Sequence, residues 1–236
     1  MAARIICVSN QKGGSGKTTV SVNLAGNLGR LGYAVLLADI DPQGSASHYV
    51  SMAAEDHEMP VTLAGLSKTG ERVHKYIQKF TDQYDYIVVD CPPVVDNKAA
   101  RSALLIAHLV IVPVQPAPLD FESTKATLEL VENTQVQNRK LKARLLATAC
   151  PRTNIADTFL AQLGDVAVPL MNASLGYRTA YREAAGQGVI VHEMGYTAQA
   201  AAEEVDALTT EVQEILHPRG IPKPVERAIA ADEDDE

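Results

Sequence analysis

Residues 12–19 constrain the fold of this chain more than any other feature of the sequence. They follow a short apolar run over residues 4–9, precede a segment of helical periodicity, and read Lys12-Gly13-Gly14-Ser15-Gly16-Lys17-Thr18-Thr19. In a strand–loop–helix unit, such glycines let backbone N–H groups turn toward phosphates, while a lysine reaches the β- and γ-phosphates and the next hydroxyl binds Mg²⁺. We therefore expect this loop to hold a nucleotide, with Lys17 as the cation and Thr18 on the metal.

The spacing within this loop departs from the common phosphate-binding pattern. That pattern has a glycine five residues before Gly16, where this chain has Gln11, and this chain carries a second lysine, Lys12, at the loop entrance. This combination defines a deviant Walker A loop.

Short apolar runs alternate with longer segments of helical period, a pattern typical of a parallel sheet with helices on both faces. The expected strands cover residues 4–9, 34–38, 86–90, 109–114 and 145–149, with a further candidate at 166–168. The expected helices cover residues 16–30, the region of residues 73–80, and a last helix through residues 205–215 that Pro218 ends. The sequence predicts an α/β, doubly wound, mostly parallel P-loop NTPase fold.

The chain of 236 residues is long enough to bury one sizeable core. We expect one ATPase domain over residues 1–217. Residues 218–236 combine spaced prolines with a terminal acidic run, Asp232 to Glu236, and we expect them to form a disordered tail. No signal-like start precedes the first strand, and no apolar run approaches the roughly 18 residues of a membrane span, so the expected location is cytoplasmic.

Acidic residues follow two of the expected strands, at the edge of the sheet where such folds bind ligands. Asp90 ends an apolar run, which is where a nucleotide ATPase holds Mg²⁺, usually through water. Asp41 lies beside Pro42 and Gln43 in a loop that we expect to be mobile, and it is our candidate for orienting or deprotonating the attacking water. Asp39 either contacts the Mg²⁺ shell or starts the turn.

These motifs resemble the successive motifs of the ParA family of deviant-Walker ATPases, clearly from about residue 4 to 120 and more weakly to about 215. Besides residues 12–19, the matching stretches are Asp39-Ile40-Asp41-Pro42-Gln43-Gly44-Ser45, Tyr86-Ile87-Val88-Val89-Asp90-Cys91-Pro92-Pro93 and Val112-Pro113-Val114-Gln115-Pro116. The resemblance implies that the chain binds ATP and Mg²⁺ and hydrolyses ATP to ADP and phosphate. It also implies that Lys12 reaches the partner's phosphates in a nucleotide-sandwiched homodimer, and that Asp41 and Asp90 belong to the first and second switches.

Members of this family position intracellular cargo, and the resemblance implies the same function for this chain. Relatives partition plasmids or chromosomes, or distribute protein organelles such as carboxysomes, as McdA does. The resemblance implies non-specific nucleoid DNA as the track, a cognate ParB- or McdB-like protein that stimulates hydrolysis, and no membrane association. No DNA-reading helix-turn-helix precedes Arg4, so the chain resembles the small members.

The net charge of −8 means that any DNA contact must come from a local basic patch. The expected last helix, residues 198–216, has no lysine or arginine, although a basic surface there is common in the family. The remaining candidates for DNA contact are Arg139, Lys140, Lys142, Arg144, Arg178, Arg182, Arg219, Lys223 and Arg227.

Several other functions are compatible with a phosphate-binding loop. A MinD-like membrane ATPase needs a basic amphipathic C-terminal helix, whereas this sequence ends in acidic residues. An iron–sulfur reductase needs two cluster-binding cysteines per subunit, and Cys7, Cys91 and Cys150 do not have such an arrangement. An ATP-dependent metabolic enzyme of related fold stays open, and a binding module without hydrolysis is disfavoured by Lys17 and Asp41.

Overall fold

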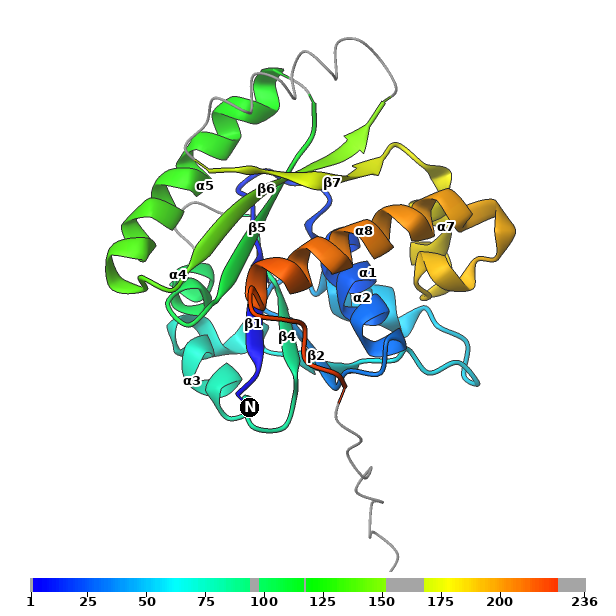
Figure 1. The fold of residues 1–236 in the computed structure, drawn as a ribbon, viewed down its shortest axis with the longest axis horizontal. Coiled ribbons are helices and arrows are strands. Elements are labelled where there is room, and N and C mark those ends of the chain that lie inside the picture. Colours follow the sequence, from blue (N-terminus) through cyan, green and yellow to red (C-terminus); the bar gives the residue numbers. More distant parts are fainter. Residues whose placement is uncertain (1, 94–97, 117, 152–167, 225–236) are drawn as a thin grey trace, which may run out of the picture.

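The computed structural model describes residues 2–93, 98–116, 118–151 and 168–224 (Figure 1). Its centre is a seven-stranded sheet in the order β3-β2-β4-β1-β5-β6-β7. Every strand pair of this sheet is parallel. The strands are β1 (Arg4–Val8), β2 (Val35–Asp39), β3 (Thr62–Gly65), β4 (Tyr86–Asp90), β5 (Leu109–Val114), β6 (Lys142–Cys150) and β7 (Leu170–Gly176).

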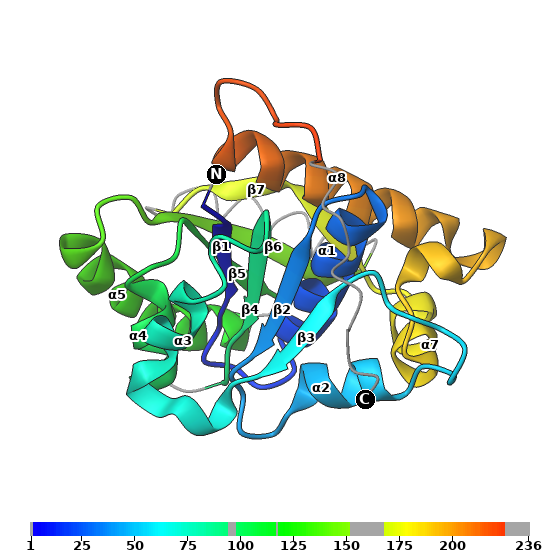
Figure 2. The ribbon, with the colours of Figure 1, turned by 90° about the horizontal axis from the view of Figure 1, so that it is seen from below.

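Helices cover both faces of this sheet (Figures 1 and 2). One face packs against α1 (Lys17–Arg30), α2 (Ser45–Ser51), α7 (Thr179–Gln187) and α8 (Gln199–Leu216), and the other against α3 (Val73–Gln78), α4 (Lys98–Leu104) and α5 (Pro118–Gln137). Short 3₁₀ helices are η1 (Ser67–Arg72), η2 (Val191–Glu193) and η3 (Tyr196–Ala198).

The central strands are buried on both faces because successive side chains point to opposite sides. In β1, Ile6 and Val8 pack into the core beneath α1 and α8, whereas Ile5 and Cys7 pack into the core beneath α3 and α4. This arrangement explains the continuous apolar runs of the sequence.

The sequence prediction of the fold is confirmed, with two differences at the sheet edges. The edge strands β3 and β7 were not expected. In β7 the residues alternate between buried and exposed, with Asn172 and Ser174 outward, so β7 lacks the apolar run of a central strand. Of the strand expected at residues 166–168, Val168 lies in a bend and the other two residues lie outside the described part of the chain.

The segment after α8 contacts the domain at its start. The hydroxyl of Tyr33 donates a hydrogen bond to the carbonyl of Pro222 at 2.9 Å. Residues 225–236, with the acidic run, lie outside the described residues, and the tail stays a prediction. In the described part of the chain, no helix combines the length and the apolar character that crossing a bilayer requires.

His108 joins the two central strands β1 and β5 at the amino-terminal edge of the sheet. Its backbone N–H donates to the carbonyl of Ile5 at 2.8 Å, and its ring Nδ1 accepts from the N–H of Ile5 at 3.1 Å. An Nδ1 that accepts must be unprotonated. Burial, together with the charges of Arg4, Lys140 and His217, lowers the pKa of His108 to about 4.

This pKa predicts a loss of stability in mild acid. The unfolded chain takes up a proton near pH 6.5, whereas the folded chain resists it until about pH 4, so the free energy of unfolding falls as the pH drops through this window. His108→Asn keeps an acceptor at the position of Nδ1 without the titration. We expect urea midpoints measured from pH 7 to pH 4.5 to fall less steeply for this variant than for the wild type. The same pH dependence of the urea midpoint in the variant and the wild type would contradict the assignment of this loss of stability to His108.

Candidate functional site

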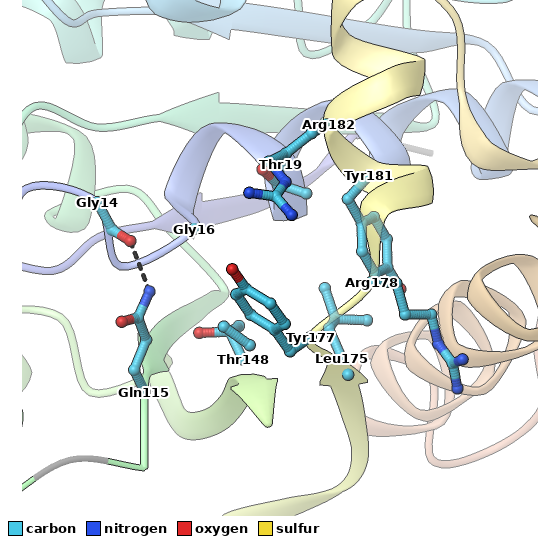
Figure 3. Close-up of a pocket in the computed structure, with 12 residues that line it drawn as sticks. Gly14, Gly16, Thr19, Gln115, Thr148, Leu175, Tyr177, Arg178, Tyr181 and Arg182 are labelled. Carbon is cyan, nitrogen blue, oxygen red and sulfur yellow. Dashed lines mark hydrogen bonds between the residues drawn. The ribbon is translucent and has the colours of Figure 1, made fainter. Parts of the chain in front are cut away.

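The loop between β1 and α1 is shaped by two glycines with left-handed backbone conformations. Gly14 has φ 75° and Gly16 has φ 92°, a region that other residues rarely adopt. Gln115 Nε2 donates to the carbonyl of Gly14 at 2.7 Å (Figure 3). The hydroxyl of Thr148 donates to the carbonyl of Ser15 at 2.9 Å. Gln115 after β5 and Thr148 near the end of β6 therefore bind the loop carbonyls. The N–H groups of the loop are left to face its concave side.

Lys17 opens α1 and is almost fully buried. Its ammonium donates to the carbonyl of Lys12 at 2.9 Å, which closes the loop on itself. Burial lowers the pKa of Lys17, and the nearby charges of Asp90, Asp41 and Cys91 oppose this shift. An ammonium group has three N–H donors, so the buried Lys17 can donate further hydrogen bonds to the oxygens of a polyphosphate.

Asp90 is fully buried at the end of β4 and receives hydrogen bonds from two hydroxyls of α1. Thr18 Oγ1 donates to Oδ2 at 2.8 Å, and Ser21 Oγ donates to Oδ1 at 2.9 Å. Burial raises the pKa of Asp90 to about 7, against the hydrogen bonds from Thr18 and Ser21. A bound cation would favour the charged carboxylate.

The two aspartates after β2 differ in their surroundings. Asp39 Oδ2 accepts from the N–H and the hydroxyl of Ser47 at 2.8 and 2.7 Å, and Asp39 Oδ1 accepts from the N–H of Asp41 at 3.1 Å. Asp39 therefore organises the turn into α2. Asp41 Oδ1 accepts from the N–H of Gln43 at 2.9 Å. Asp41 is buried and close enough to Lys17 to influence its pKa.

The residues present fit a nucleotide and Mg²⁺. Among the described residues, the buried hydroxyl of Ser15 has no hydrogen-bond partner, and no side chain caps the N-terminus of α1 at Gly16. A Cβ added at Gly13 or Gly14 would meet no atom within 4 Å, so the cradle has room for phosphates. Thr18 and Asp90 supply hydroxyl and carboxylate oxygens, the ligand types that Mg²⁺ prefers.

A cavity of about 230 Å³ continues from the loop toward β6, β7 and α7 (Figure 3). The ring of Tyr177 and the guanidinium of Arg182 face each other at 5.3 Å on its wall. Ala149, also on the wall, has φ 49°, an unusual value that is often found at binding sites. The cavity has an aromatic and apolar lining beside the phosphate loop, which suits a nucleobase.

The structure brings together the predicted residues Lys12, Lys17, Thr18, Asp41 and Asp90. Sequence reasoning missed the contributions of Ser21, Ser47, Gln115 and Thr148. Ser21 left a signal, because its spacing from Thr18 places both hydroxyls on one helix face, and Gln115 lies in a stretch that matches a family motif. The other contacts join elements that are distant in sequence.

The cavity wall comes from Gln115, Thr148 and Ala149 and from residues of β7 and α7, which the unexpected edge strand β7 places there.

The predicted DNA-contact residues do not form one surface. Arg178 is paired with Glu204 at 2.7 Å and lines the cavity beside the loop, as does Arg182. Arg139 and Lys140 line a separate cavity with His108, at the opposite edge of the sheet. Arg227 lies outside the described residues.

Comparison with known proteins agrees with this geometry. Residues 6–191 match the CobQ/CobB/MinD/ParA nucleotide binding domain. The chain is 32% identical over 213 residues to maintenance of carboxysome distribution protein A from Halothiobacillus neapolitanus, covering 88% of this chain and 95% of that protein. It is 33% identical over 188 residues to the chromosome-partitioning ATPase Soj from Thermus thermophilus, covering 68% of this chain and 75% of Soj.

A solved structure gives the same fold. A complex of a Cyanothece McdA variant with ATP superimposes with a TM-score of 0.74 at 16% identity, over 89% of this chain and 96% of that chain. The chain therefore belongs to the CobQ/CobB/MinD/ParA family of nucleotide-binding domains, as a P-loop ATPase of the ParA type.

Proposed function

We propose that this chain is a positioning ATPase whose ATP-bound homodimer holds nucleoid DNA and whose hydrolysis is stimulated by a cognate ParB- or McdB-like protein. Its similarity to a carboxysome distribution protein over 95% of that protein's length supports this function and favours a protein organelle as the cargo. The observation that carries the ATPase cycle is the Thr18–Asp90 contact at 2.8 Å, which joins the phosphate loop to the acidic end of β4.

In this proposal each residue of the site has a distinct role in phosphoryl transfer. Lys17 and the N–H groups of residues 13–19 would bind the phosphates, and Thr18 and Asp90 would hold Mg²⁺. Bound Mg²⁺ neutralises charge on the β- and γ-phosphates. Asp41 orients the attacking water, since its carboxylate lies near Lys17 on the loop after β2.

Lys12 acts in trans in this proposal. Its side chain stands at the loop entrance, whereas its carbonyl accepts the hydrogen bond from Lys17 within the same subunit. A lysine supplied by the second subunit neutralises phosphate charge only when two subunits close, which couples ATP to association.

Two alternatives make different predictions. A MinD-like membrane role is disfavoured because α8, the last described helix, has no basic residue with which to hold an anionic leaflet. An ATP-dependent metabolic enzyme of the same fold would respond to a small substrate instead of DNA.

ATP turnover distinguishes positioning from metabolism. We expect turnover to rise several-fold when duplex DNA and the protein encoded by a neighbouring gene are added together, and to stay unchanged with carboxylate or amine metabolites. Stimulation by a metabolite alone would contradict the positioning function. Heat-denatured partner protein serves as the control.

Lys12→Ala removes the proposed contact in trans and leaves the carbonyl that Lys17 uses. We therefore expect ATP binding to a single subunit to persist, while ATP-dependent dimerisation and hydrolysis are lost. Light scattering with and without ATP measures the association, and Lys223→Ala, at an exposed position, is the control. A variant that dimerises and hydrolyses normally would show Lys12 to be an ordinary surface residue.

Asp41→Ala and Asp41→Asn test the proposed role of Asp41 in positioning water. Phosphate contacts in the ground state come from the loop, so ATP affinity is expected to stay within about twofold while kcat falls by roughly 10²–10⁴. The asparagine variant retains an acceptor for the N–H of Gln43 and so controls for the turn. Normal kcat in either variant would remove Asp41 from the mechanism.

A further inference from the structure

The helix that the family resemblance favours for DNA contact is electrostatically unsuited to it. α8 carries Glu203, Glu204, Asp206, Glu211 and Glu214 and no lysine or arginine. This surface repels a phosphate backbone. If DNA is the track, another face must bind it.

α3 lies on the other side of the sheet from α8 (Figure 1). A row of cations runs from η1 through α3 to Lys79, the residue that follows α3. Lys68, Arg72, Lys75 and Lys79 are all exposed, and we call them the α3 stripe. At 100° per residue, Arg72, Lys75 and Lys79 fall within an arc of about 60°. The opposite side of α3 presents Val73 and Ile77, which are completely buried in the core, so the packing of α3 fixes the direction of the stripe.

The surroundings of the stripe leave its positive charge largely uncompensated. The nearby Glu71 pairs with Lys98 at 3.0 Å, and Arg101 on α4 is a further exposed cation. Within the described residues, none of the ion pairs involves Lys68, Arg72 or Lys75. Lys79 lies over the ring of Tyr76 at 5.2 Å. On a chain with a net charge of −8, this concentration of cations is a distinct feature.

We propose that the α3 stripe binds the phosphate backbone of double-stranded DNA without reading its sequence. This inference rests on the proposed function for the choice of DNA as the ligand. A helix rises about 1.5 Å per residue, so Arg72 and Lys79 are separated by about 10 Å along the axis, a length that four successive phosphates of one strand span at about 3.4 Å each.

The composition of the stripe favours DNA over an acidic protein partner. Protein interfaces have an apolar centre, and within residues 67–80 the one exposed large apolar side chain is that of Tyr76, under Lys79. Interfaces with DNA are polar and positively charged. Long lysine and arginine side chains also adapt to a backbone of any sequence.

The stripe is connected to the nucleotide site. The N–H of Leu66, which precedes η1, donates to the carbonyl of Asp39 at 2.8 Å. α4, which packs against η1 and α3, begins at Lys98, shortly after Asp90. The end of β2 is thus hydrogen-bonded to the residue that precedes η1, and the helix that follows Asp90 packs against η1 and α3. We therefore expect DNA affinity to differ between the ATP and ADP states.

The test removes the charges of the stripe from the full chain. Arg72→Gln, Lys75→Gln and Lys79→Gln are combined, and binding of a fluorescent duplex of scrambled sequence is measured by anisotropy with Mg²⁺ and a non-hydrolysable ATP analogue. We expect the affinity to fall roughly tenfold or more, and the slope of log affinity against log salt to decrease by up to about 2.7, since each phosphate contact contributes about 0.9.

A matched variant controls for net charge. Arg139→Gln, Lys140→Gln and Arg219→Gln remove the same charge from exposed positions outside the stripe, and we expect the affinity and the slope to stay near those of the wild type. Equal losses in both triple variants would overturn the proposal. Basal ATP turnover is expected to be unchanged in the stripe variant. A fall in both ATP turnover and DNA binding, seen in the triple variant and also in Lys75→Glu alone, would show that these side chains are needed for folding. That result would contradict the proposal.

The remaining outcomes separate the stripe from the proposed function. DNA binding by the stripe variant at wild-type affinity would overturn the stripe and leave the DNA track intact. A wild-type protein that hydrolyses ATP but binds polyglutamate instead of duplex would overturn DNA as the ligand, in favour of an acidic partner. Stimulation of turnover by the cognate partner would then still support the positioning ATPase.

Discussion

The contact between Asp90 and the hydroxyls of Thr18 and Ser21 is the interaction on which the rest of the site depends. A carboxylate that is fully buried at the end of a strand is costly unless hydrogen bonds or a cation compensate its charge. Both hydroxyls come from the first turns of α1. The hydrogen bonds to Asp90 therefore fix α1 against β4. They also direct the N-terminus of α1, with its N–H groups, toward the position of the phosphates.

The strand order converts this local contact into a site. β1 lies between β4 and β5, so the loop after β1 meets Asp90 on one side and Gln115 on the other. Asp39 pairs in register with Asp90 across β2 and β4, which brings the loop of Asp41 to the same edge. Residues separated by about a hundred positions in sequence converge because parallel strands end together.

The sequence predicted the fold because its elements have short-range signatures, and for the same reason it singled out the loop of residues 12–19. The roles of Thr18 and Asp90 in holding Mg²⁺ stay predictions. The loop combines glycines and lysines at fixed spacing, and the central strands are continuous apolar runs. The cavity wall at Tyr177 and Arg182 had no such signature, since it depends on how β6 and β7 pair. The hydrogen bond from Gln115 to Gly14 depends on the pairing of β1 with β5. The α3 stripe was not predicted from the sequence, and the packing of Val73 and Ile77 into the core fixes the direction in which it faces.

The distribution of charge bears on how such a protein releases its track. A protein that is basic overall remains on DNA in any nucleotide state, because its whole field attracts the polyanion. Here the net charge of −8 and the acidic α8 oppose association, so in the proposed binding mode the attraction comes from the α3 stripe. Contact through a few phosphates is weak and sensitive to the orientation of the stripe. Because Leu66, which precedes η1, is hydrogen-bonded to the carbonyl of Asp39, the proposed binding mode links the balance between attraction and repulsion to the position of the loop that holds Asp41.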